Sequence, residues 1–264
     1  CSAGNHAQGV ALAATKNGIK SLICLPDSAP ISKVEATKGF GAEVCLVEGC
    51  YDDAYQKALE LKEKEGYTFV HPFDDENVIA GQGTIALEIL NDLDNIDAIV
   101  VPVGGGGLIS GIAYTAKHIR PSIKIYGVQA AGAPSMHNSV QKGEIACLPS
   151  VSTIADGIAV KKPGENTYAL VNEYVDEIAL VSDDEIASAI LALIEKQKMI
   201  AEGAGAAAVA AVMTGKFDLK GKRVVAVVSG GNIDVTSLSR VIDRGLINSG
   251  RSSSLLIELI DKPG

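Results

Sequence analysis

The amino-acid sequence predicts an α/β protein with two lobes, each built on a mainly parallel β-sheet covered by helices. Short apolar segments alternate with segments of helical periodicity along most of the 264 residues, as in parallel sheets that are buried on both faces. These segments fall into two groups, before and after about residue 72. The chain is long enough for two modest lobes with a sizeable core.

The first group predicts a small lobe over residues 1–72. Helical periodicity follows Asn5, and the short apolar runs after it have the length and spacing of strands. The predicted elements are a helix beginning near Asn5, a strand at 21–26, a helix at 31–40, a strand at 42–47, a helix at 52–64 and a strand at 67–70.

The second group predicts a larger lobe over residues 73–247. The predicted elements are a helix at 77–93, a strand at 98–103, a helix at 107–119, a strand at 124–129, helices at 183–198 and 202–214, and a strand at 223–228. The segment 135–177 is less periodic and contains Pro149 and Pro163, so it predicts surface elaboration of this lobe. Residues 245–254 are rich in glycine and serine and predict a linker.

Both ends of the sequence indicate a piece of a longer protein. The first residue is Cys1, which lies inside a patterned segment. The apolar run at 254–260 predicts a strand that enters a further domain. Residues 248–264 are therefore expected to be a linker and the beginning of that domain.

Composition narrows the class of protein. The net charge of −9 and the pI near 5.0 argue against nucleic acid or an anionic membrane as partner. The five cysteines form no C-x-x-C pair, so we expect reduced, mostly buried thiols in a cytoplasmic protein. The longest uncharged stretch, 98–116, contains a proline and four glycines, which makes it unsuitable as a membrane helix. No signal peptide is visible.

Four consecutive glycines, Gly104–Gly107, separate the predicted strand at 98–103 from the helix that follows. A run of glycines is entropically costly and indicates that the backbone approaches something closely. A strand, a glycine turn and a helix N-terminus together form an anion site, because free N–H groups and the helix dipole point at the same place. We expect a phosphate there.

Nucleotide-binding motifs fit poorly. In the dinucleotide fingerprint G-x-G-x-x-G the third glycine position is taken by Ser110, and the next strand ends in Gln129 without an acid for a ribose. The Gly215-Lys216 pair is followed by Phe217, where a nucleotide phosphate loop needs Ser or Thr. A small phosphorylated cofactor is the better candidate.

Two further loops carry polar groups beside predicted elements. Ser2-Ala-Gly-Asn-His6 precedes a helix and could bind a carboxylate, although a simple helix cap would look similar. Ser229-Gly-Gly-Asn232 follows a strand, where a plain glycine turn is the alternative. Three such loops on one α/β scaffold indicate one composite ligand site.

Six motifs in this order resemble the threonine dehydratase (threonine ammonia-lyase) family, whose members have the tryptophan-synthase-β-like fold (fold type II) and use pyridoxal 5′-phosphate. The resemblance covers about residues 1–247, and the tail 254–264 is similar to the first strand of an ACT regulatory domain. The motifs are Ser-Ala-Gly-Asn-His-Ala-Gln-Gly at 2–9, His-Pro-Phe-Asp-Asp at 71–75, Gly-Gln-Gly-Thr at 81–84, Pro-Val-Gly-Gly-Gly-Gly-Leu at 102–108, Ala-Asp-Gly-Ile-Ala-Val at 155–160 and Ser-Gly-Gly-Asn at 229–232.

The resemblance implies roles for these residues. The backbone N–H groups of Gly104, Gly105, Gly106, Gly107 and Leu108 would bind the cofactor phosphate. Asn5 would bond the pyridoxal 3′-oxygen and Ser229 the pyridine nitrogen, which a serine would leave largely neutral. The loop of Ser2, Ala3, Gly4 and His6 would bind the substrate carboxylate.

The implied reaction is removal of the α-proton of an amino acid followed by loss of its β-hydroxyl group as water. Threonine would give 2-oxobutanoate and ammonia, and serine would give pyruvate and ammonia. The resemblance leaves open whether the role is biosynthetic, in isoleucine formation, or catabolic. It also implies a homo-oligomer, a dimer or a tetramer, and allosteric control by an amino acid through the ACT domain.

Two positions depart from related patterns. In the related serine racemases a serine that serves as a second acid/base stands at the position of Ala3, and alanine cannot exchange a proton. This favours dehydration over racemisation. Relatives can bind a divalent cation near Glu202, but Ala208 lacks the second carboxylate that some of them have, and a helix of small residues packed on the sheet is the alternative.

Other hypotheses about the function stay open. Another fold-type-II enzyme, such as a serine racemase, a hydroxyaspartate dehydratase or a β-replacement synthase, would carry similar loops. A non-catalytic module that binds an amino acid or a phosphate is a candidate from a different class, and a nicotinamide-dependent oxidoreductase is weakened by Ser110 and Gln129.

The family's Schiff-base lysine lies in a Ser-Phe-Lys-x-Arg-Gly type motif, upstream of the loop at which this sequence begins, and no such motif occurs later. We therefore predict that residues 1–264 alone do not deaminate threonine, because the nucleophile and general base are missing. A 2-oxo acid assay on the purified chain checks this. Turnover comparable to that of a full-length relative would contradict it.

Overall fold

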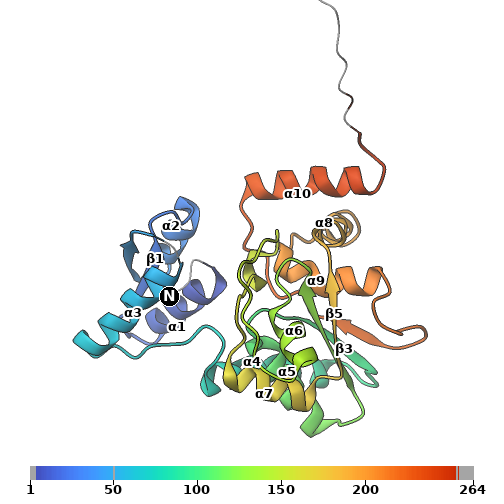
Figure 1. Ribbon diagram of the computed structural model, residues 1–264, viewed down its shortest axis with the longest axis horizontal. Coiled ribbons are helices and arrows are strands. Elements are labelled where there is room, and N and C mark those ends of the chain that lie inside the picture. The colour runs from blue at the N-terminus through green and yellow to red at the C-terminus, as the bar shows by residue number, and fades with distance from the viewer. Residues whose placement is uncertain (1–3, 50, 254, 256–264) are drawn as a thin grey trace, which may run out of the picture.

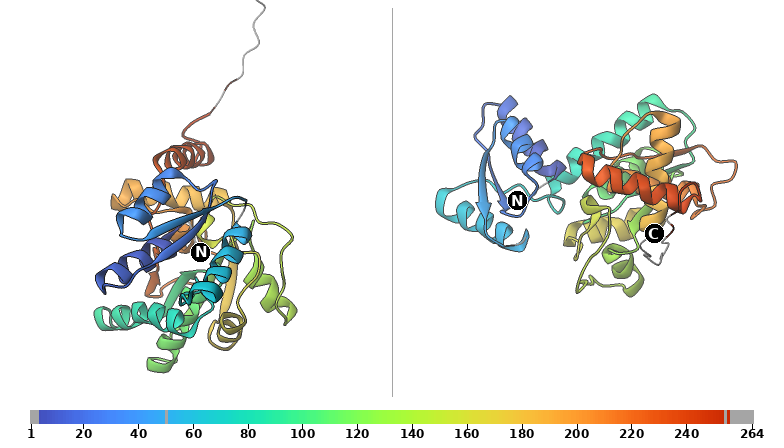
Figure 2. Two further views of the ribbon diagram at one scale, coloured as in Figure 1. Left: turned by 90° about the vertical axis from the view of Figure 1, so that its left-hand side faces the viewer. Right: turned by 90° about the horizontal axis from the view of Figure 1, so that it is seen from above.

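The computed structural model describes residues 4–49, 51–253 and 255. It shows two lobes that are joined by the segment between the helices α3 (Tyr51–Glu65) and α4 (Glu76–Asp92). Figure 1 shows the small lobe, in blue and cyan, beside the larger one, and the right-hand view of Figure 2 shows the same separation from above. The bounds predicted for the lobes stay a prediction, and most of the tail 248–264 lies outside the described residues.

The small lobe contains two parallel strands, β1 (Leu22–Pro26) and β2 (Glu43–Val47). The helices α1 (Asn5–Lys16) and α2 (Ile31–Gly39) share a hydrophobic cluster with one face of β1. Ile23 and Leu25 belong to that cluster, and the alternation of side chains along a strand turns Cys24 to the opposite face. The helix α3 contacts both strands.

The large lobe contains four parallel strands in the order β5-β4-β3-β6. They are β3 (Ala98–Pro102), β4 (Lys124–Ala130), β5 (Glu177–Val181) and β6 (Val224–Ala226). The other elements are α5 (Gly107–Ile119), α6 (Ser135–Lys142), a 3₁₀ turn (Asp156–Ile158), α7 (Glu165–Tyr174), α8 (Asp183–Ala192), a π-helical turn (Leu193–Gln197), α9 (Gly203–Met213) and α10 (Val235–Asn248).

Helices cover both faces of this sheet, as the sequence predicts. Val100 packs in a cluster with residues of α8 and α9, whereas its neighbours Ile99 and Val101 pack in a second cluster with residues of α4 and α5. All five residues of β3 are buried. In the part of the chain that the structure describes, no helix has the length and apolarity needed to cross a membrane.

Two sequence predictions about individual elements are wrong, and a third, the linker, is wrong in part. Residues 67–70 form no strand: the segment is mostly exposed and pairs with no other strand among the described residues. The segment 135–177 is not surface elaboration, because it supplies α6, α7, β5 and core residues such as Met136 and Ile158. Its buried polar residues interrupt the apolar periodicity, and several of them are hydrogen-bonded within the fold, as where Ser139 Oγ donates to the Ser135 carbonyl oxygen at 2.7 Å.

The linker predicted at 245–254 begins inside α10, because residues 245–248 are helical. Gly245 is a helical residue at the contact between α10 and α8, where an added Cβ would lie 3.0 Å from the Ala187 carbonyl oxygen. The glycine therefore permits close helix packing and does not mark a flexible segment. The cysteines also differ in part from expectation: Cys24 is buried, but Cys147 is exposed, and Cys1 and Cys50 lie outside the described residues.

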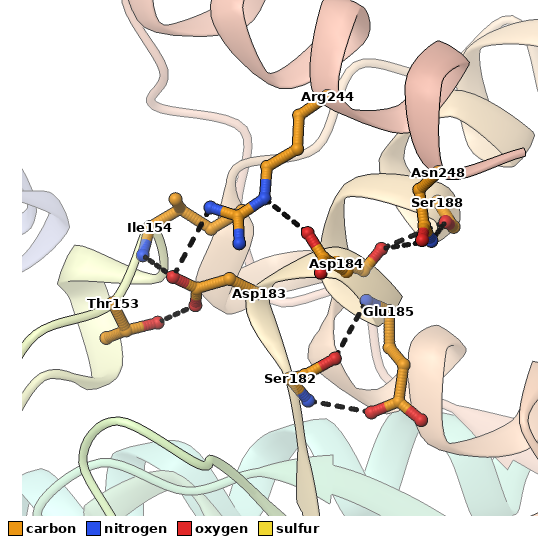
Figure 3. Close-up of polar contacts among 9 residues, drawn as sticks. All are labelled: Thr153, Ile154, Ser182, Asp183, Asp184, Glu185, Ser188, Arg244 and Asn248. Carbon is orange, nitrogen blue, oxygen red and sulfur yellow. Dashed lines mark hydrogen bonds and ion pairs between the residues drawn. The ribbon is translucent and has the colours of Figure 1, made fainter.

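A polar network joins α8, α10 and the segment before the 3₁₀ turn (Figure 3). Asp183 accepts hydrogen bonds from Thr153 Oγ1 at 2.5 Å and from the Ile154 N–H at 3.2 Å. Arg244 of α10 pairs with Asp184 at 2.5 Å and lies 3.7 Å from Asp183. Ser182 and Glu185 form a capping box at the start of α8. This network orients the chain that leads into the 3₁₀ turn.

We predict that Asp183→Ala destabilises the chain more than Asp184→Ala does. The first change removes both acceptors of the 153–154 segment and costs about 1–3 kcal/mol of unfolding free energy. The second removes only an ion pair of a half-exposed side chain, worth about 0–1 kcal/mol. Both remove one negative charge from the first turn of α8, so the pair is matched. Urea unfolding of the two variants measures the difference, and equal losses would contradict the role of Asp183.

Candidate functional site

Two of the three predicted loops leave the same edge of the large sheet. The strands β3 and β6 are adjacent and parallel, with Ala98 opposite Val224 and Val100 opposite Ala226. The glycine loop, Gly104–Leu108, follows β3, and the loop 229–232 follows β6. They are therefore neighbours at the carboxyl edge of the sheet, where ligands of open α/β sheets bind.

The glycine loop presents backbone N–H groups. Three of its carbonyl groups are occupied: Gln129 Nε2 donates to the Gly104 oxygen at 3.5 Å, Thr167 Oγ1 to the Gly105 oxygen at 2.6 Å and the Ser110 N–H to the Gly106 oxygen at 2.9 Å. Within the described chain, no acceptor is recorded for the N–H groups of residues 105–108. These amides stand at the N-terminus of α5, where the helix dipole adds positive potential, so the loop fits a phosphate.

Close packing explains why this loop consists of glycines. An added Cβ on Gly105 would lie 2.5 Å from the ring of Phe73, and one on Gly107 would lie 2.9 Å from the Phe73 backbone. Gly106 has a φ of +99°, in the left-handed region, and a Cβ there would meet Met136 at 2.6 Å. The backbone is therefore pressed against its neighbours and cannot carry side chains.

The segment 71–75 brings Phe73 to the glycine loop. His71 Nδ1 accepts hydrogen bonds from the Phe73 N–H at 3.2 Å and the Asp74 N–H at 2.7 Å. Burial lowers the pKa of His71, which agrees with a neutral ring whose Nδ1 is an acceptor. Asp74 accepts from the N–H groups of Glu165 and Thr167 at 3.0 and 3.1 Å at the start of α7. His71 thus organises this turn through its ring nitrogen.

The third loop reaches the site from the small lobe. Asn5, at the start of α1, donates from Nδ2 to Glu202 Oε1 at 2.6 Å. Both atoms lie against Gly230, where an added Cβ would be 2.8 Å from Asn5 Nδ2. The Gly230 carbonyl accepts from the Glu202 N–H at 3.1 Å. Asn5, Glu202 and the loop after β6 therefore form one contact between the lobes.

A second contact between the lobes lies on the 3₁₀ turn. Lys33 of α2 pairs with Asp156 at 2.9 Å. The turn packs on the glycine loop, since a Cβ on Gly104 would lie 3.1 Å from the Ile158 Cα, and it faces α9, since a Cβ on Gly157 would lie 3.0 Å from Ala204. The turn thus bridges the small lobe and the anion cradle.

The structure brings the predicted cofactor residues together at this edge, although their individual roles stay predictions. Ser229 is exposed at the end of the strand segment, and the Nδ2 atom of Asn232 is buried with no partner among the described residues. Gly4 lies half-buried in the loop before α1. Ser2 and Ala3 lie outside the described residues, so their assignment to the substrate carboxylate has no structural counterpart here.

His6 has a different neighbour from the one predicted. Its Nε2 atom lies 3.1 Å from the Val70 carbonyl oxygen, to which it donates. Burial lowers the pKa of His6, which favours the neutral ring, and donation from Nε2 leaves Nδ1 as the acceptor in that form. This contact ties the start of α1 to the connection between the lobes. Binding of a substrate carboxylate by His6 stays a prediction.

The cation site predicted weakly at Glu202 stays a prediction as well. Among the described residues, no group of three His, Cys, Asp or Glu side chains gathers closely enough to hold a metal ion. The Glu202 carboxylate is bound instead by Asn5, and the residues after it in α9 are almost all buried glycine and alanine.

Sequence reasoning assigned no role to Phe73, Asp74, Lys33 or Asp156. Three of them stand inside motifs that carried the family resemblance, so the motifs were found but their function was not. The contacts of Asp74 with Glu165 and of Lys33 with Asp156 join residues more than 90 positions apart, and no periodicity in the sequence reports such pairs.

Burial raises the pKa of Glu202 above its ordinary value of 4.5, against the lowering effect of the Asn5 hydrogen bond. The side chain is only 6 % exposed. A raised pKa favours folding below pH 4.5, and this contribution is lost as the pH rises through the pKa of the folded state. The ionised form at neutral pH therefore destabilises the chain relative to a neutral isostere.

We predict that Glu202→Gln matches the wild type in melting temperature at pH 4 and exceeds it at pH 7 to 8, because Gln keeps an oxygen for Asn5 without the buried charge. Thermal melts across that range measure the difference. Glu144→Gln, on the exposed surface, controls for net charge. A Glu202 variant that is less stable at neutral pH would contradict the prediction.

The chain is similar in sequence and in structure to several known proteins. The chain is 52% identical over 263 residues to an L-threonine ammonia-lyase of Thermotoga maritima, covering 100% of this chain and 65% of that protein. The chain thus spans just under two thirds of that relative. Among solved structures, a processed threonine deaminase isoform 2 from Solanum lycopersicum superposes with a TM-score of 0.87 at 42% identity, over 92% of this chain and 71% of that one.

A serine racemase from Dictyostelium discoideum also superposes, with a TM-score of 0.82 at 37% identity, over 89% of this chain and 76% of that one. The family described as pyridoxal-phosphate dependent enzymes matches residues 1–230, which include the first two loops along the chain and the beginning of the loop 229–232. The amide cradle of the glycine loop and these similarities lead to one conclusion: the chain belongs to the family of pyridoxal-phosphate-dependent enzymes.

Proposed function

We propose that the protein containing this chain is an ammonia-lyase that converts L-threonine, and L-serine, to the 2-oxo acid and ammonia. The observation that carries the proposal is the meeting of three loops at one sheet edge. The first has amides for which the described chain offers no acceptor, the second has Ser229 and the third has Asn5. The choice of threonine rests on the 52% identity to a relative of that name.

Pyridoxal phosphate, when bound, supplies the electron sink that makes the α-proton of an amino acid acidic. In this proposal the N–H groups of Gly104–Leu108 bind its phosphate, and the α5 dipole stabilises the negative charge. Phe73 packs against Gly105 and Gly107, and these glycines are buried. Charge-dipole interactions are strongest where water is excluded.

The other two loops orient the ring. Asn5 keeps a second amide hydrogen and its oxygen after donating to Glu202, so it can still bond a ring substituent. The Ser229 hydroxyl is neutral, so it can bond a ring nitrogen without protonating it. A neutral ring nitrogen would be a weaker electron sink, which would favour loss of a β-hydroxyl over other reactions of the amino acid.

The lobes are held across the site by two contacts, Asn5 with Glu202 and Lys33 with Asp156. We propose that these contacts keep the small-lobe loop 2–6, which would bind the substrate carboxylate, in line with the large-lobe cradle. Location in the cytoplasm and assembly as a homo-oligomer stay predictions from composition and from the resemblance.

The test uses the full-length protein that contains this chain. L-Threonine and L-serine should give 2-oxo acid and ammonia in equal amounts, and the enzyme should carry a bound chromophore with the absorption of pyridoxal phosphate. Serine recovered from the reaction should keep its configuration, because Ala3 cannot exchange a proton. Substantial racemisation would favour the racemase instead.

A matched pair of variants tests the cradle. Gly107→Ala must displace the Phe73 backbone, whereas Gly81→Ala, in α4, meets no atom within 4 Å. We predict that Gly107→Ala lowers cofactor affinity at least about tenfold, equivalent to about 1.4 kcal/mol, and that Gly81→Ala leaves it unchanged. Chromophore retained on dialysis measures the affinity. Equal retention would contradict binding at the glycine loop, and a chromophore without turnover would contradict the substrate.

A further inference from the structure

Two cysteines lie directly opposite each other in the small lobe, away from the site described above. In the parallel pair of β1 and β2, Cys24 is the register partner of Cys45. Adjacent strands are about 4.8 Å apart, which lies inside the range of Cα separations, about 4.4–6.8 Å, that a disulfide bridges. Register partners in parallel strands point to the same face, so the two thiols are neighbours.

The face they share lies away from the hydrophobic cluster of the lobe. Ile23 and Leu25 point to α1 and α2, so Cys24 between them points to the other face, which α3 covers. The two thiols differ in access: Cys24 is 2% exposed, whereas Cys45 is only partly buried. An oxidant from solvent therefore meets Cys45 first, and Cys24 stands behind it.

The electrostatic surroundings distinguish the pair from an isolated buried thiol. Burial first, and then the neighbouring Cys45 to which it is hydrogen-bonded, raise the pKa of Cys24 to about 11, although Lys57 has a lowering effect. Lys57 of α3 interacts with both cysteines and also pairs with Glu60 at 3.1 Å. A cation beside a thiol favours its thiolate form, which is the form that reacts with peroxides.

We propose that Cys24 and Cys45 form an oxidant-sensitive thiol pair that closes to a reversible disulfide when hydrogen peroxide reaches Cys45. Register partners on parallel strands have Cβ atoms that run side by side and do not converge, so the bridge is strained and readily reduced. The pair is therefore a dithiol under reducing conditions and a disulfide only under oxidative load, which suits a modification site and not a permanent staple.

The chemistry balances in two steps. The Cys45 sulfur attacks one oxygen of hydrogen peroxide, the O–O bond breaks, and the leaving hydroxide takes the thiol proton to become water, which leaves Cys45 as a sulfenic acid. The Cys24 sulfur then attacks the Cys45 sulfur, the S–O bond breaks, and a second water leaves with the Cys24 proton. Both thiols lose one electron each, and one peroxide is reduced to two waters.

Peptide mapping of the oxidised protein tests the proposal. Trypsin places Cys24 in the peptide 21–33 and Cys45 in the peptide 39–57, which also contains Cys50. After hydrogen peroxide and alkylation, we expect these two peptides to be linked, with the loss of two hydrogen atoms, and to separate on addition of dithiothreitol. Absence of the linked pair from wild-type protein, with Cys147 oxidised instead, would overturn the proposal.

Cysteine variants identify the two thiols that form the disulfide. The linked pair should persist in Cys50→Ser and vanish in Cys45→Ser and Cys24→Ser. Its persistence in Cys45→Ser would show that Cys50 is the partner and overturn the proposal.

Lys57→Met and Lys64→Met form a matched pair that tests the lysine, since both lysines bind Glu60 but Lys57 is the one that interacts with the cysteines. We expect Lys57→Met to slow linkage about threefold. If Lys64→Met slowed linkage equally, Lys57 would have no specific role in the reaction.

Discussion

The close approach of bare backbone at the glycine loop is the constraint on which the arrangement of the site depends. Amides can face an anion only if their carbonyls are satisfied elsewhere and no side chain intervenes. Thr167 and Gln129 occupy the carbonyls, and Phe73 and Met136 fill the space that side chains would need. Four segments that are distant in sequence are therefore fitted around one turn, and each of them carries further contacts of the site.

The segment 71–75 connects the glycine loop to the helices α4 and α7. His71 and Asp74 organise the turn by bonds to backbone amides, and Asp75 caps α4. Through these bonds the start of α4, the start of α7 and the glycine loop share one short connection. The same connection leaves the small lobe at Val70, which His6 binds. The lobes thus meet at the anion cradle through the chain itself and through the Asn5–Glu202 bond.

Much of the fold could be predicted from the sequence. Buried parallel strands such as 98–103 are continuous apolar runs, and the helices between them have clear periodicity. Predictions were wrong where polar residues are buried, as in 135–177, and where glycine serves packing, as at Gly245. In those places a partner distant in sequence decides the packing, as Gly105 does for Thr167 and Ala187 for Gly245, and the local pattern carries no record of it.

The sequence by itself determined the α/β class and, through its motifs, membership in a cofactor-dependent family, and it predicts a phosphate cradle after the strand at 98–103. These depend on local chemistry: strand periodicity, glycine conformational freedom and helix dipoles. Only the tertiary structure decided that Phe73 covers the cradle, that Asn5 bonds Glu202 across the lobes and that Cys24 faces Cys45. Such pairings depend on how strands are ordered and how lobes dock, and folding alone brings those residues together.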